Sequence, residues 1–178
     1  MLKRNNFVFI ALHIIVWLIF VGLCIEAGGL IVNFVFSVFK PQFVGNLYQK
    51  LDLSKMYQQN QWFFFGMYGF LLFVSILKAA LFYTLIRLHY KLDLSKPFSN
   101  YVADKIKSLA FYTFSIGIIG FIGSQVAESL LHYGYETGKL NKFWEDSEAF
   151  ILMSAVVYVI YQIFKRGVEL QNENDLTV

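Results

Sequence analysis

One stretch of the chain, residues 62–88, is apolar over almost its whole length and carries a single cation, Lys78, in its interior. At about 1.5 Å of rise per helical residue, a stretch of this length can cross the ~30 Å hydrocarbon core of a bilayer. A charged side chain inside such a span is energetically costly and is therefore typical of a functional position. The stretch predicts a membrane-spanning helix with Lys78 as a candidate functional group.

Three other blocks of apolar residues accompany this one. The 178 residues are 57% hydrophobic, and the apolar positions form long blocks rather than amphipathic stripes, which is typical of an integral membrane protein. The net charge of +3 is small, so it does not favour direct nucleic-acid binding. No linker composition divides the blocks, and we expect a single all-α domain, an integral membrane four-helix bundle in a lipid bilayer. The expected segments are spans at about residues 7–32, 62–88, 106–131 and 148–166, followed by a cytoplasmic tail at 167–178.

The connection between the first two spans has a helical periodicity of its own. Pro41 suits the first turn of a helix, and Val44, Leu47 and Leu51 recur at helical spacing after it. This pattern predicts an amphipathic interfacial helix over residues 41–57 that lies at the membrane surface. The alternative is a loop helix that packs on the bundle.

The distribution of basic residues predicts the orientation of the spans. Cytoplasmic loops of membrane proteins carry an excess of lysine and arginine. If both termini are cytoplasmic, the larger group of basic residues lies inside, which predicts a multi-pass protein of the bacterial cytoplasmic (inner) membrane with both termini in the cytoplasm. The inner group comprises Lys3, Arg4, Arg87, Lys91, Lys96, Lys105, Lys107, Lys165 and Arg166, and the outer group Lys40, Lys50, Lys55, Lys139 and Lys142.

Polar residues within the spans can be compared by depth. Counting helical rise from the cytoplasmic basic residues puts four of them about 13 Å into the membrane. We expect these four to form an inner polar layer, made of His13, Lys78, Ser115 and Tyr158. In one interpretation Lys78 is an anchor whose ammonium group snorkels to the headgroups. In the other it is a buried lysine, hydrogen-bonded to Ser115 or Tyr158, that lines a path for a substrate or ion.

Two glutamates, Glu26 and Glu128, lie further along their spans. The same count places them about 28–31 Å from the cytoplasmic boundary, near the outer surface, so we expect neither to form a salt bridge with Lys78. Residues 28–29, both glycine, are expected to kink or end the first span beside Glu26. The two glutamates are either separate interfacial carboxylates or, together with Gln125, an acidic vestibule that attracts a cation.

A stripe of small residues on the third span indicates a helix-packing face. Gly117, Gly120 and Ser124 recur at helical spacing, and small residues let a neighbouring helix approach closely. The same stripe is a candidate surface for assembly into a homo-oligomer.

The sequence contains no recognisable catalytic or cofactor motif. The three histidines are spread over different depths and Cys24 is the only cysteine, so neither a zinc site nor an internal disulfide is expected. We therefore expect no enzyme activity, metal or cofactor.

The C-terminal sequence FKRGVELQNENDLTV, residues 164–178, closely resembles the ending of a bacterial family of four-span membrane proteins catalogued as domain of unknown function 2975. The sequence KPFS, residues 96–99, looks like a second feature of that family. The resemblance implies an integral membrane protein of unsettled activity. It also implies one candidate partner, a small helix-turn-helix regulator, because members are often encoded beside one.

The tail itself alternates apolar and acidic residues, which predicts a docked rather than a free segment. We expect its carboxylates to meet the basic residues of the cytoplasmic loop. This set is Glu169, Glu173 and Asp175 with Arg87, Lys91, Lys105 and Lys107.

Two functions are compatible with these features. The first is a membrane-embedded sensor or regulatory module that acts through its cytoplasmic loop and tail. The alternative is an oligomeric subunit of a transporter or channel for a small solute or an ion, in which Lys78 and the glutamates line the pathway.

Overall fold

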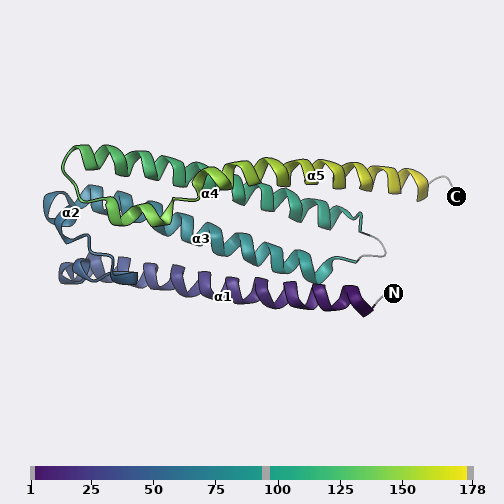
Figure 1. Ribbon diagram of the computed structural model, residues 1–178, viewed down its shortest axis with the longest axis horizontal. Helices are drawn as coiled ribbons and strands as arrows, with labels where there is room; N and C mark the ends of the chain where they lie inside the picture. Colours follow the sequence, from purple (N-terminus) through teal and green to yellow (C-terminus); the bar gives the residue numbers. More distant parts are fainter. Residues whose placement is uncertain (1–2, 94–96, 176–178) are drawn as a thin grey trace.

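The computed structural model describes residues 3–93 and 97–175, which are almost entirely helical (Figure 1). Four segments are long and apolar enough to cross a membrane, so the predicted all-α class with four spanning helices is confirmed. The long helices are α1 (Lys3–Phe39), α3 (Gln61–Lys91), α4 (Asn100–His132) and α5 (Ser147–Asp175), and the short ones are α2 (Ser54–Gln59), η1 (Pro41–Gly45), η2 (Tyr48–Lys50) and η3 (Gly138–Phe143).

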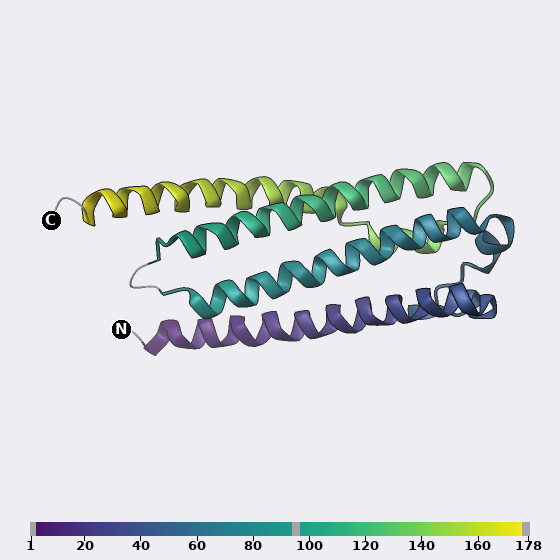
Figure 2. The same cartoon turned by 180° about the vertical axis from the view of Figure 1, so that it is seen from behind.

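The long helices lie side by side in the order of the sequence. α1 packs along α3, α3 along α4 and α4 along α5, and the described residues provide no extensive contact of α1 with α4 or α5. Views from opposite sides show the same row, with both termini at one end and the longer connections at the other (Figures 1 and 2). We call these the terminal end and the loop end.

The first helix is longer than the sequence predicted. Residues 28–29 do not end it, and α1 continues to Phe39 because the residues up to that position remain apolar. Gly29 instead makes room for the connection that comes next in the chain: a Cβ atom at this position would lie 2.6 Å from the Tyr48 ring. The stretch Phe7–Phe39 of this helix is long and apolar enough to cross a membrane.

The connection between α1 and α3 is helical, but it is divided into η1, η2 and α2. Gln49 and Lys50 adopt positive φ angles of 56° and 58°, which interrupt a regular α-helix. Five of its apolar residues are buried, so the connection packs on the helices as the alternative interpretation of the sequence expected. These five residues belong to a loop-end core to which α1, α3, α4 and the α4–α5 connection also contribute. The core comprises Val44, Leu47, Leu51, Leu53 and Met56 of the connection with Leu30, Phe64, Met67, Tyr68, Leu71, Ala127, Leu130, Leu140, Phe143 and Trp144.

Polar contacts join this connection to the one between α4 and α5. Lys55 forms an ion pair with Glu136, and Lys142 Nζ donates a hydrogen bond of 3.0 Å to Gln49 Oε1. The hydrogen bond and attraction to Glu136 raise the pKa of the Lys55 ammonium group. Both partners of the ion pair are exposed, so these contacts set the relative positions of the connections more than they stabilise the fold.

The last helix also extends beyond its predicted end. Lys165 and Arg166 do not stop α5, which continues to Asp175. Because Gly167 lies against Phe98, just before α4 begins, the residues after Gly167 extend about 12 Å beyond the neighbouring helix. At the start of α4, Ser99 caps the helix: its Oγ accepts a hydrogen bond of 3.3 Å from the Val102 amide.

Candidate functional site

His13 does not lie beside Lys78 as the sequence predicted for the inner polar layer. His13 stacks on His89 with ring centroids 5.1 Å apart. Lys78 lies eleven residues before His89, which is about 16 Å along the helix, so the placement of His13 beside Lys78 was wrong. The depth count failed because Arg4 and Arg87 are not level: Phe9, only five residues after Arg4, already contacts His89.

Lys78 itself is half-buried in the middle of α3. Its Nζ atom lies 5.7 Å from the centroid of the Phe150 ring on α5, a cation–π geometry. Among the described residues it makes no hydrogen bond to Ser115 or Tyr158. Tyr158 packs against Tyr161 instead, with ring centroids 5.8 Å apart.

The two glutamates predicted near the outer surface lie at different depths. Glu26 is in the interior of α1, between Phe20 and Phe34, and the helix continues for thirteen residues after it. Glu128 lies near the end of α4, in the last five residues before the helix stops at His132.

Glu128 and Gln125 belong to a cavity of about 520 Å³ between α4 and the start of α5, which we call the α4–α5 pocket. Two further carboxylates, Glu145 and Glu148, line it together with Ser124. The described residues contain no group of three or more metal-ligating side chains placed to hold an ion.

The predicted packing face on α4 is used within the chain. A Cβ atom at Gly117 would lie 2.6 Å from Ile151 Cγ1 and 2.8 Å from the Ile151 amide nitrogen, and one at Gly120 would overlap Ser147. A Cβ atom at Gly123 would lie 3.3 Å from the Trp144 ring, so Gly123 rather than Ser124 continues this close contact. The stripe is therefore covered by α5 and does not offer a free surface for a second copy.

Glu169 does not make the contact with the loop between α3 and α4 that the sequence predicted. Glu169 pairs with Arg166 on its own helix, with Oε2 2.9 Å from Nη1, so its expected contact with the loop was wrong. Arg166 and Glu169 are three residues apart on one helix, so they can pair whether or not another helix or loop lies nearby. The spacing of the tail residues therefore could not distinguish this pair from a contact with the loop. Glu173 adds to the attraction on Arg166, and the Asp175 side chain lies outside the described residues.

The loop cations lie over aromatic rings instead: Arg87 over Tyr83, Lys91 and Lys105 over Tyr101, and Lys107 over Tyr161.

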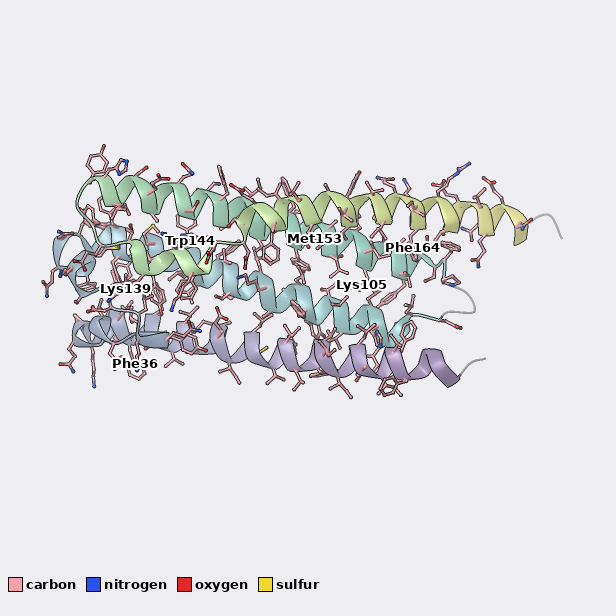
Figure 3. All side chains as sticks on the ribbon, in the orientation of Figure 1. Phe36, Lys105, Lys139, Trp144, Met153 and Phe164 are labelled. Carbon is pink, nitrogen blue, oxygen red and sulfur yellow. The ribbon has the colours of Figure 1, made fainter. Side chains whose placement is uncertain are left out.

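Apolar contacts hold the base of the tail. Phe98 packs on Phe164 with ring centroids 5.4 Å apart, Val168 is buried, and a Cβ atom at Gly167 would lie 2.8 Å from Phe98 Cγ. Phe164 lies toward the terminal end of α5 and Trp144 at its opposite end (Figure 3). Sequence reasoning missed this contact. The available signal was Gly167, a glycine directly after Lys165 and Arg166, because a glycine within a helix can mark a place where another side chain approaches closely.

Phe98 and Gly167 belong to the two stretches that carried the family resemblance, so the contact joins one described residue of each. In comparisons with known proteins, no family model matches the chain, and no curated protein or solved structure is detectably similar to it. The function of the chain is therefore inferred from the arrangement of its own residues.

Proposed function

We propose that this protein is a sensor or regulatory module embedded in the bacterial cytoplasmic membrane, with both termini in the cytoplasm. The observation that supports this proposal best is the continuity of α5. One unbroken helix begins at Ser147, presents Glu148 to the α4–α5 pocket and ends in the protruding tail at Asp175. A solute that binds in the pocket would contact the same rigid element that a cytoplasmic partner would contact at the other end.

The packing of α5 supports such coupling. The absence of side chains at Gly117 and Gly120 lets α4 and α5 touch closely beside the pocket, and the Phe98–Gly167 contact fixes the helix at the terminal end. A helix held at two points can shift as a body when contacts at one end change. The output would then be a change in the position or exposure of the tail.

The surface available to a partner is an open groove of about 880 Å³ along the terminal half of α5. It combines apolar side chains with the polar groups of the tail, and Ile163 and Leu170 are more than half exposed. A mixed apolar and polar groove suits a protein partner, and we propose the helix-turn-helix regulator implied by the family resemblance. The groove is lined by Phe98, Tyr158, Val159, Gln162, Ile163, Arg166, Gly167, Leu170, Gln171 and Asn174.

Removing the tail should abolish capture of this partner. We expect the full chain in detergent to retain the regulator in a pull-down and a chain truncated after Arg166 to lose it, because the truncation removes the Leu170 part of the groove. A matched control is Leu152→Ser, an exposed α5 residue outside the groove, which should bind normally. Equal capture by the full and truncated chains would contradict the proposal.

A transporter or channel subunit is the competing proposal, and the position of Glu26 and Lys78 within the spans favours it. Ionisable residues within spans are typical of ion and proton pathways. Reconstituted liposomes would discriminate the two proposals. Solute or ion flux that depends on Lys78 would favour the transporter, and partner capture without flux would favour the sensor.

A further inference from the structure

Two ionisable side chains in the middle of the membrane-spanning helices lack an ion-pair partner among the described residues. Glu26 on α1 and Lys78 on α3 are both half-buried, and neither occurs in the ion pairs of the structure. Charged residues within membrane spans usually pair with one another or line a water-filled cavity, because an isolated charge in hydrocarbon is costly. Lys78 has an aromatic ring beside it, which compensates only part of that cost.

Ring contacts between α1 and α3 show that the two charges are at nearly the same depth. Phe20 contacts Tyr83, with centroids 6.0 Å apart, and Phe34 stacks on Tyr68 at 5.5 Å. The helices are antiparallel, so counting from either contact puts Glu26 opposite residues 76–77 of α3. Lys78 is one or two residues from that level, an offset of about 1.5–3 Å.

The two side chains also leave their helices on the same side of the row. Gly29, one turn after Glu26, lies beneath Tyr48 of the connection between α1 and α3. Leu71, two turns before Lys78, is buried in the loop-end core, which includes the buried residues of this connection. Residues three, four and seven positions apart share a helix face, so Glu26 and Lys78 both project toward the face that the connection covers.

The separation of the helices is within the reach of the two side chains. Packed helices lie about 8–10 Å apart, and a lysine and a glutamate that project from one face can together bridge that gap. We propose that Glu26 is the counter-ion of Lys78, and that the two form an intramembrane charge pair between α1 and α3. This inference goes beyond the proposed sensor function and does not depend on it.

The pair would place a second partner of Lys78 on the opposite side of α3. Lys78 lies over Phe150 of α5 in the structure, while its proposed counter-ion is on α1.

A double-mutant cycle tests the pair, with the thermal unfolding midpoint (Tm) of the full chain measured in phosphatidylcholine nanodiscs. Glu26→Gln and Lys78→Met should each lower Tm by roughly 5 °C or more, because each leaves one charge without its partner. The double variant should recover to within about 2 °C of the original protein, because both charges are then gone. The charge-swapped variant, Glu26→Lys with Lys78→Glu, should recover in the same way.

Glu128→Gln supplies the matched control, because Glu128 is an exposed carboxylate near the end of α4. Combined with Lys78→Met, its effect on Tm should simply add. Additive effects of the Glu26 and Lys78 substitutions, including no effect of either, would overturn the pair. If the single variants do not fold, the proposal requires that the double and charge-swapped variants do, and their failure would overturn it equally.

Discussion

Replacing Gly117 by alanine should lower the free energy of unfolding by about 2–3 kcal/mol, at the upper end of the usual cost of overpacking. The added Cβ atom would lie 2.6 Å from Ile151 Cγ1 and 2.8 Å from the Ile151 amide nitrogen. A side chain can turn away, but the backbone of α5 cannot, so α4 and α5 must separate. This separation would also distort the α4–α5 pocket, which the same two helices line.

Gly28→Ala is the control for this substitution, since no atom lies within 4 Å of the added methyl group and alanine favours the helix by about 1 kcal/mol over glycine. We expect it to leave stability unchanged or to raise it. Both variants can be compared by denaturant titration in detergent, followed by circular dichroism. Equal stability of the two variants would show that α4 and α5 do not touch at Gly117.

Replacing Phe64 by alanine should cost about 3–5 kcal/mol, the usual range for a buried phenylalanine. The Phe64 side chain is 0% exposed and lies in the loop-end core. Its ring contacts those of Tyr57 and Tyr68, with centroids 5.2 Å and 5.6 Å apart. The substitution would therefore leave a cavity between α3 and the connection that packs on it.

Phe73→Ala on the same helix serves as the comparison, because that side chain is 54% exposed and loses few contacts. Its effect on unfolding in detergent should stay below about 1 kcal/mol. If Phe64→Ala proved as mild as Phe73→Ala, the connection would not be packed as described, and a surface helix such as the sequence predicted would describe residues 41–57 better.

The sequence predicted features that depend on long or strongly local patterns. The four apolar helices follow from composition, and the packing at Gly117 and Gly120 follows from small residues at helical spacing. Each of these signals lies within a single element. None of them requires knowing how two elements are aligned.

Features that depend on relative alignment could not be predicted in this way. The depth of His13 required a common reference level, and the basic residues used for it differ in height from helix to helix. Residues 41–57 are divided into separate short helices because Gln49 and Lys50 adopt positive φ angles. Neither glutamine nor lysine favours that backbone conformation, so the sequence did not predict the interruption. The contact of Phe98 with Gly167 joins positions far apart in the sequence, and only the fold brings them together.

The proposed function depends most on α5 continuing through Arg166 and resting on Phe98. A disulfide trap tests this directly: Phe98→Cys with Gly167→Cys, in a Cys24→Ser background, analysed by mass spectrometry of peptides after mild oxidation. A Cβ atom at position 167 would lie 2.8 Å from Phe98 Cγ, which is compatible with the short Cβ separation of a disulfide. We predict efficient cross-linking of this pair and little with Lys165→Cys, which projects from the other side of the helix. Equal cross-linking at both positions, or none at Gly167, would show that the tail is not a docked extension of α5.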